Sequence, residues 1–179
     1  MRTSTAILDL PFAPPSIEGF SGRRETNNSS RTFFNAENQA KFPVVRRIAN
    51  AFKDEHVIDT IERTTRADLT DTRLRIEYCQ DAPGFWLEPH TDISVKKFTM
   101  LVYLSGDPAL RLAGTDIHEG PPDHTYVTTA TPTGATSASS SFRAKNTWHG
   151  VGHHPLTGLR RSLIINYVTA GWRDTFELA

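Results

Sequence analysis

A series of eight short β-patterned segments fills most of the chain after Asp71. Most are rich in β-branched and aromatic residues, and glycine, proline or polar residues separate them. Strands this short favour two packed antiparallel sheets or a barrel of the jelly-roll kind. The predicted strands cover residues 72–79, 86–92, 97–105, 109–113, 124–130, 139–143, 146–151 and 160–168.

Two amphipathic helices are predicted before these strands. From Asn38 to Phe52 apolar residues recur at intervals of three and four, and Pro43 is tolerable in a first turn. A second, shorter helix is predicted from Glu55 to Thr64. We expect both helices to pack their apolar faces against the outside of a sheet.

Residues 1–34 are rich in proline, glycine and polar residues, so most of this segment is predicted to be irregular. It can act as an arm that covers the sheets. Alternatively, it forms a lid over a substrate through Arg23, Arg24 or Phe33.

Length and composition indicate one domain. With 179 residues, 37% of them hydrophobic and 22% charged, the chain resembles an ordinary globular protein. We expect residues 1–70 to form the arm and supporting helices, and residues 72–168 to form the β core. The net charge is zero, which argues against partners such as nucleic acid or anionic membranes.

The sequence also carries signals about the compartment. The N-terminal apolar run is too short for a signal peptide and no later segment approaches a membrane span, so we expect a cytoplasmic protein. Cys79 is the only cysteine, which excludes an intrachain disulfide and a thiolate zinc site. We expect Cys79 to be a buried structural thiol.

The segment from Phe85 to Asp92 ends in His90-X-Asp92. Alternate side chains of an extended strand share a face, so Trp86, Glu88, His90 and Asp92 are expected to point the same way. His90 and Asp92 can then hold one metal ion. Trp86 and Glu88 either border the substrate or, with equal weight, serve barrel packing and an edge salt bridge.

His149 is the obvious third metal ligand, because it lies in the predicted distant strand at residues 146–151. Two histidines and one carboxylate with an open face suit non-haem Fe(II) and its oxygen chemistry. The same donors also accept Zn, Ni or Co. His153 and His154 are interpreted as loop histidines, because the neighbouring glycines and proline oppose a helix.

Arg160 and Ser162 open the last predicted strand and share one face. A guanidinium group beside a hydroxyl is well suited to hold a carboxylate. Arg161 is the competing anchor, although a regular strand would turn it to the opposite face.

His90-X-Asp92, then His149, then Arg160-X-Ser162 resembles the Fe(II)/2-oxoglutarate-dependent oxygenase superfamily. The wording Glu-Pro-His-Thr-Asp at residues 88–92 and Trp-His-Gly-Val at residues 148–151 is most similar to its prolyl-hydroxylase-like branch. The resemblance covers roughly residues 72–168.

The resemblance implies a mainly β fold with supporting helices, namely a double-stranded β-helix of the jelly-roll, cupin-like kind with the N-terminal helices packed on its outside. It implies Fe(II) bound by His90, Asp92 and His149. It also implies 2-oxoglutarate as co-substrate with O2, its far carboxylate held by Arg160 and Ser162. Tyr103 matches a tyrosine that bonds the same carboxylate in prolyl hydroxylases.

The implied reaction is oxidation, above all hydroxylation, of an unactivated C–H bond in a small-molecule or amino-acid-like substrate, with release of succinate and CO2. No side-chain acid or base beyond the metal site is expected. One alternative is a cupin-like metal-binding protein or non-redox metalloenzyme, which the wide separation of His90 and His149 in the sequence disfavours. Another is an inactive scaffold. The sequence leaves the oligomeric state open.

Overall fold

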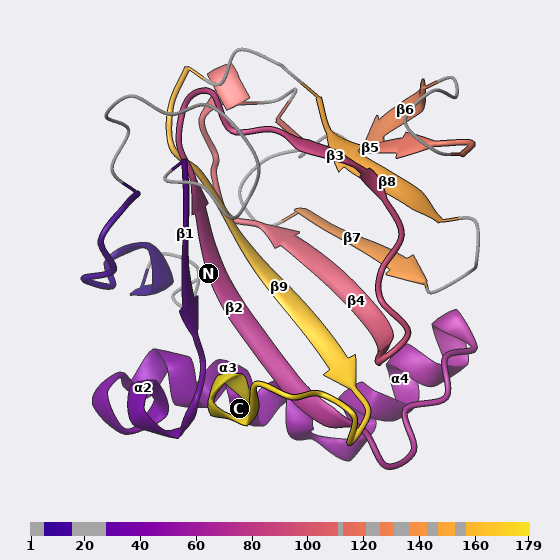
Figure 1. Cartoon of the computed structure of the whole chain (residues 1–179). Helices are drawn as coiled ribbons and strands as arrows, with labels where there is room; N and C mark the ends of the chain where they lie inside the picture. The colour runs from indigo at the N-terminus through magenta and orange to yellow at the C-terminus, as the bar shows by residue number, and fades with distance from the viewer. Residues whose placement is uncertain are drawn as a thin grey trace.

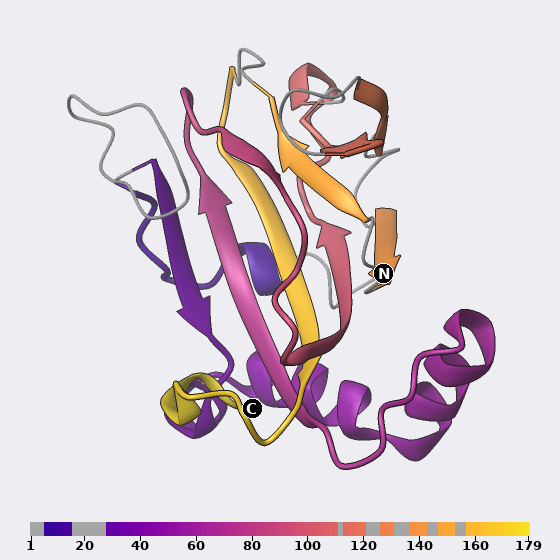
Figure 2. The same ribbon diagram turned by 45° about the vertical axis from the view of Figure 1, so that its right-hand side comes forward.

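The computed structural model describes residues 6–15, 28–110, 113–120, 126–130, 137–142, 147–152 and 157–179, with the backbone alone for residues 126–130 and 137–142. The fold is mainly β and contains two antiparallel sheets. The smaller sheet lies against one face of the larger sheet, and helices lie at the other side (Figures 1 and 2). Over the described residues, no strand pairing closes the two sheets into a barrel.

The larger sheet has the strand order β1-β2-β9-β4-β7. Two long central strands, β2 and β9, pair along their whole length, which places Asp81 opposite Arg160 and Cys79 opposite Ser162. The strands are β1 (Ser29–Phe33), β2 (Arg73–Asp81), β4 (Lys96–Tyr103), β7 (Ser137–Phe142) and β9 (Arg160–Val168).

The smaller sheet has the order β3-β8-β5-β6. Its first two strands come from distant parts of the chain and pair His90 with His149. The strands are β3 (Leu87–His90), β5 (Thr115–His118), β6 (Tyr126–Ala130) and β8 (Trp148–Val151).

The two faces of the larger sheet differ in character. Its outer face carries Ile76, Ile165 and similar apolar residues, which join Val45 and Ile61 from the helices in the main hydrophobic core. Its inner face, turned toward the smaller sheet, carries buried polar and charged side chains such as Arg160 and Asn166. Side chains alternate between the two faces along each strand, and this alternation collects the polar and charged residues on the inner face.

The helices are α2 (Ala36–Lys41), α3 (Pro43–Lys53) and α4 (Glu55–Thr65). They pack on the sheet as predicted, and α4 agrees with its predicted range. The single predicted helix from Asn38 to Phe52 is wrong, because two helices meet at an extended Phe42. A residue before proline is driven away from the helical conformation, so Pro43 begins a new helix instead of continuing the first.

The strand predicted at 109–113 is also wrong. Residues Pro108–Leu110 form a 3-10 turn, in which the Asp107 side chain accepts a hydrogen bond from the Ala109 N–H at 2.8 Å. Aspartate forms such turns readily through its own side chain. The strand of this region is β5, which begins at Thr115 and in which the polar Asp116 and His118 obscure the β pattern.

The N-terminal segment contributes more regular structure than predicted. Residues 6–8 form a helical turn, and β1 pairs with β2 at the edge of the larger sheet. Arg23 and Arg24, considered above as lid residues, lie outside the described residues. Cys79 is fully buried and keeps its thiol, as predicted. Across the described part of the chain, no helix combines the length and apolar character needed to cross a membrane.

Candidate metal centre and adjoining cavities

His90, Asp92 and His149 come together between the two sheets. One potential ligand atom from each lies within 4.8 Å of the other two. The β3–β8 pairing places the histidine rings side by side, with centroids 4.5 Å apart. Asp92 lies beyond the end of β3, so the expected regular strand through residue 92 is wrong, although the three side chains still converge.

Both histidines use the same local contact to fix their rings. Nδ1 of His90 lies 2.8 Å from the Glu88 carbonyl oxygen, and Nδ1 of His149 lies 3.0 Å from the Thr147 carbonyl oxygen. A carbonyl oxygen only accepts, so Nδ1 must carry the proton in both rings. When such a ring is neutral, Nε2 carries the lone pair that a metal ligand needs.

Asp92 is held by two donors. Lys96 Nζ donates to Oδ1 at 2.7 Å, and Thr99 Oγ1 donates to Oδ2 at 2.6 Å. Burial by itself raises the pKa of Asp92, but the Lys96 ammonium, these hydrogen bonds and the nearby His149 outweigh it and lower the pKa. The carboxylate is therefore ionised at neutral pH, as a metal ligand must be.

Thr99 links Asp92 to the buried Asn166. The hydroxyl oxygen lies 2.9 Å from Asn166 Oδ1, while Asn166 Nδ2 has no hydrogen-bond partner in the described structure. A hydroxyl has one proton to donate, and Thr99 gives it to Asp92. Turning the amide by 180° lets the Asn166 N–H donate to Thr99, which completes a chain of donors from β9 to Asp92.

Arg160 is the most deeply buried cation of the inner face, with 2% of its surface exposed. Its guanidinium lies between the rings of Phe85 and Tyr103, with its central carbon 5.9 and 5.7 Å from their centroids. Nε is 3.6 Å from Asp81 Oδ2. Three polar atoms have no hydrogen-bond partner among the described residues, namely Nε and Nη1 of Arg160 and the hydroxyl oxygen of Ser162.

Tyr103 lies beside this group but is directed toward the smaller sheet. Its hydroxyl donates to Thr115 Oγ1 at 2.8 Å and accepts from the Thr115 N–H at 3.1 Å. Arg161 faces the opposite side of β9, where it lines a cavity with Leu8 and Leu104. The structure therefore places Arg160, and not Arg161, on the inner face with the metal ligands.

The cavity directly beside the three ligands is small, about 30 Å³. Thr99, Leu101, Thr115 and Ile164 close it on the side of the larger sheet and β5. This volume accommodates water but not an organic acid.

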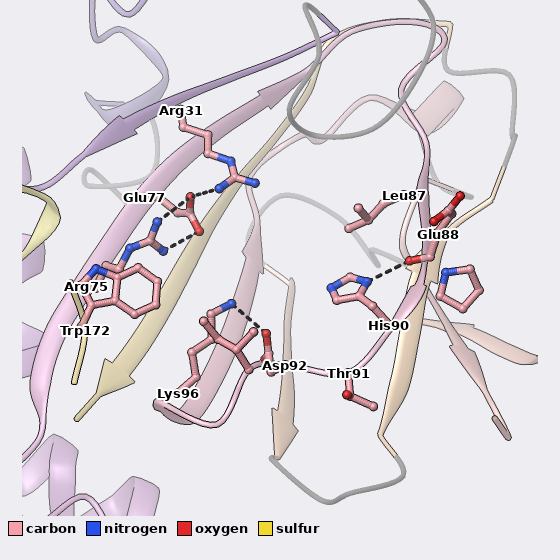
Figure 3. Close-up of a pocket in the computed structure, with 12 residues that line it drawn as sticks. Arg31, Arg75, Glu77, Leu87, Glu88, His90, Thr91, Asp92, Lys96 and Trp172 are labelled. Atoms are coloured by element: carbon pink, nitrogen blue, oxygen red, sulfur yellow. Dashed lines mark hydrogen bonds and ion pairs between the residues drawn. The ribbon is translucent and has the colours of Figure 1, made fainter. Parts of the chain in front are cut away.

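A second cavity of about 320 Å³ opens on the other side of His90 and Asp92 (Figure 3). Its far wall consists of charged residues of β1 and β2 together with Trp172. Arg75 and Glu77 are almost fully buried there. Burial by itself lowers the pKa of Arg75, but Glu77 and Glu177 outweigh it and raise the pKa.

The two residues predicted to border a substrate differ in position. Glu88 lines the larger cavity, whereas Trp86 is not among its lining residues. The β3–β8 register shifts between Leu87 and His90, so the simple alternation that grouped Trp86 with His90 does not hold. His153 and His154 lie outside the described residues.

Sequence reasoning missed several residues of these cavities, above all Arg31, Arg75, Glu77 and Lys96, and it also missed Asp81 beside Arg160. A usable signal existed for β2, where Arg75, Glu77 and Asp81 alternate with Leu74, Ile76 and Tyr78. Charged residues at every second position of a strand that is otherwise apolar indicate a polar face.

A scan against protein-family models and a search of curated proteins found no match to this chain.

Proposed function

We propose that the protein is an Fe(II)- and 2-oxoglutarate-dependent dioxygenase that hydroxylates an unactivated C–H bond of a small-molecule or amino-acid-like substrate, releasing succinate and CO2. The observation that carries the proposal is the convergence of two histidines and one carboxylate, with one potential ligand atom of each within 4.8 Å of the other two. Both rings donate Nδ1–H to a backbone carbonyl, which leaves Nε2 as the nitrogen for a metal. Two neutral imidazoles and one carboxylate form the donor set of a non-haem Fe(II) centre.

The strand order supports a double-stranded β-helix. Strands β2, β9, β4 and β7 form one antiparallel layer, and β3, β8, β5 and β6 form the other. The chain therefore passes repeatedly between two four-stranded layers, with β1 added at one edge. The metal ligands lie on β3, just after it, and on β8, facing the inner side of the larger sheet.

The residues present also fit 2-oxoglutarate. Arg160 and Ser162 offer buried donors that lack hydrogen-bond partners in the described structure, and Arg160 is already positioned by two aromatic rings. Buried polar atoms without partners are rare in folded proteins, and a bound carboxylate would satisfy those of Arg160 and Ser162. Because the cavity near the metal ligands is only about 30 Å³, the proposal includes movement of its lining side chains when the co-substrate binds.

The protein's own residues position and protect the reactants. Backbone carbonyls orient His90 and His149, Thr99 and Asn166 orient Asp92, and Arg160 anchors a carboxylate. The iron and 2-oxoglutarate, when bound, would supply the activation of O2, which is the oxidant of the C–H bond. Leu101 and Ile164 give the centre an apolar wall on the side of the larger sheet.

A cupin-like metal-binding protein is the second candidate, and one contact favours it. Asp81 lies within 3.6 Å of Arg160, so the arginine already has a negative neighbour and its charge does not require an anionic co-substrate. In this alternative the same three ligands bind a metal that does not undergo redox chemistry.

An anaerobic titration separates the two candidates. Metal-stripped protein is titrated with Fe(II), with and without 2-oxoglutarate, and the visible charge-transfer band of the chelated co-substrate is followed. The oxygenase gives this band. Asp92→Ala abolishes or alters the band, and Arg160→Ala raises the required concentration of 2-oxoglutarate by about tenfold or more.

Matched controls are Asp59→Ala and Arg46→Ala, which alter exposed helix residues on the far side of the larger sheet. Both are expected to behave as the wild type. Metal binding without the band in the wild-type protein would refute the oxygenase and favour the cupin-like protein.

A further inference from the structure

The larger cavity places the metal ligands opposite a charged wall. His90 and Asp92 lie on one side, while Arg31, Arg75, Glu77 and Trp172 lie on the other (Figure 3). At about 320 Å³ it falls in the size range of small-molecule sites. A ligand held by the far wall would therefore face the metal centre.

Arg75 is engaged within the wall through each of its three nitrogens. Nε donates to Glu177, and Nη1 and Nη2 donate to the two oxygens of Glu77. It also lies between the rings of Phe33 and Trp172, with its central carbon 4.9 and 4.6 Å from their centroids. Arg75 is thus a structural element of the wall.

Arg31 differs from Arg75 in this respect. It projects from the edge strand β1, and its one ion pair within the described residues joins Nη1 to Glu77 Oε2 at 3.3 Å. Its Nε is buried without a hydrogen-bond partner in the described structure, and 29% of the side chain is exposed. A guanidinium fork with free donors at a cavity wall matches a carboxylate.

The carboxylates of this cavity are already engaged. Glu77 is shared by two arginines, and Glu88 also has an interaction partner. Asp92 now binds Lys96, but a divalent cation on Asp92 would repel the Lys96 ammonium, which lines the same cavity. Among the charged side chains of this cavity, the capacity left for a ligand is therefore that of donors, above all Arg31 and a Lys96 displaced from Asp92.

We propose that this cavity binds a small carboxylic acid of amino-acid size as the substrate, with Arg31 as the main anchor of its carboxylate and Lys96 as a second donor. The inference rests on the proposed oxygenase function and adds the substrate class. Arg31 contributes specificity, since it lies across the cavity from the metal ligands and holds the end of the substrate that does not react.

The test follows binding rather than turnover. Anaerobic wild-type protein is loaded with Fe(II) and 2-oxoglutarate, and the charge-transfer band is recorded while L-amino acids, 2-hydroxy acids and dicarboxylic acids are added singly. Each acid is paired with its primary amide. We expect at least one acid to perturb the band saturably and its amide to need at least about tenfold more.

Three variants test Arg31 itself. Arg31→Gln is expected to keep the band, which demonstrates an intact metal and co-substrate site, while the half-saturating concentration of the acid rises about 10- to 100-fold. Arg31→Lys is expected to give an intermediate value, because it keeps the charge but not the fork. Arg46→Gln, on the exposed face of α3, is expected to match the wild type.

The outcomes distinguish the two proposals. If the band never forms in the wild type, the oxygenase function fails and the substrate inference fails with it. If the band forms but no acid perturbs it, or acids and amides act equally, or Arg31→Gln leaves the half-saturating concentration unchanged, the substrate inference alone is wrong.

Discussion

Gly150 lies so close to Leu87 that a Cβ on Gly150 would be 2.7 Å from the Leu87 carbonyl oxygen and 3.0 Å from the Pro89 nitrogen. Both neighbours are backbone atoms, so no side-chain rotation can relieve the clash. The glycine therefore permits the close approach of β3 and β8 that sets His90 beside His149.

Gly150→Ala is expected to push these strands apart and to lower the free energy of unfolding by about 1–3 kcal/mol. It is also expected to weaken metal binding, measured by calorimetric titration with Co(II). Gly158→Ala is the matched control, because its nearest neighbours lie at ordinary contact distances of 3.8 and 3.9 Å. Equal behaviour of the two variants would contradict this role of Gly150.

Removing the Lys96 ammonium is expected to strengthen metal binding. In the metal-free protein it balances the buried Asp92 charge at 2.7 Å, and a bound cation must work against it. Lys96→Met is expected to increase the affinity for Co(II) about tenfold. The variant is expected to be less stable than the wild type in EDTA, by roughly 1 kcal/mol.

Lys97→Met, which alters the exposed neighbouring residue, serves as the control for Lys96→Met. Thermal unfolding in EDTA gives the stability of the metal-free protein, and the further stabilisation in excess Co(II) gives the affinity for the metal. A Lys96→Met variant that binds metal more weakly than the wild type would show that the ammonium orients Asp92 instead of competing with the cation.

For metal affinity, the hydroxyl of Thr99 is expected to matter more than the volume of its side chain. Thr99→Val keeps the volume but removes the donor to Asp92 and breaks the link to Asn166. Loss of a hydrogen bond to a metal ligand commonly costs 10- to 100-fold in metal affinity, which is the expected range here. Thr99→Ser keeps the hydroxyl and is expected to retain most of the affinity, and a Ser variant as weak as the Val variant would refute the argument.

Alternation along a strand assigns side chains to faces without knowledge of the partner strand. It placed Arg160 and Ser162 on one face of β9 and Arg161 on the other, as found. It did not hold around His90 and Asp92, because β3 ends at His90 and its register shifts. Contacts between neighbouring strands could not be predicted in this way, because they depend on the register of the strand pairs. Nothing local indicates that Asp81 lies opposite Arg160, or that the polar residues Ser29–Phe33 form an edge strand beside β2.

Asp81 is expected to oppose co-substrate binding. It is 1% exposed, accepts a hydrogen bond from Ser29 at 2.7 Å and lies 3.6 Å from Arg160 Nε. Under the proposed function, the far carboxylate of 2-oxoglutarate must approach an arginine that already has a negative neighbour. Asp81→Asn removes that charge, so the half-saturating concentration of 2-oxoglutarate is expected to fall about three- to tenfold in the anaerobic titration.

The same Asp81→Asn change leaves Arg160 buried without a counter-ion when no co-substrate is present. We therefore expect the variant to be destabilised by about 3 kcal/mol and to recover part of this loss in saturating 2-oxoglutarate. Ser29→Ala, which removes only the hydrogen bond to Asp81, is the milder comparison. A rise in the half-saturating concentration for Asp81→Asn would instead assign Asp81 the role of positioning Arg160.

Tyr167 links β9 to α3 and makes the stability of the fold decrease at alkaline pH. Its hydroxyl donates to the Phe52 carbonyl oxygen at 2.5 Å, and burial raises its pKa from 10.0 to about 12. Between pH 10 and 12 the unfolded chain loses the phenol proton while the folded protein retains it. Ionisation therefore favours unfolding, and this contribution is present below pH 10 and lost as the pH rises toward 12.

Tyr167→Phe removes both the hydrogen bond and the ionisation. We expect it to cost about 1 kcal/mol at pH 8. Between pH 8 and pH 11.5 the stability of the wild type is expected to fall more steeply than that of the variant, by a difference of order 1–2 kcal/mol. Urea unfolding at both pH values measures the free energy of unfolding of each protein. Subtracting one from the other removes the contribution of the tyrosines that both proteins contain. Parallel losses would mean that Tyr167 ionises equally easily in the folded and unfolded states.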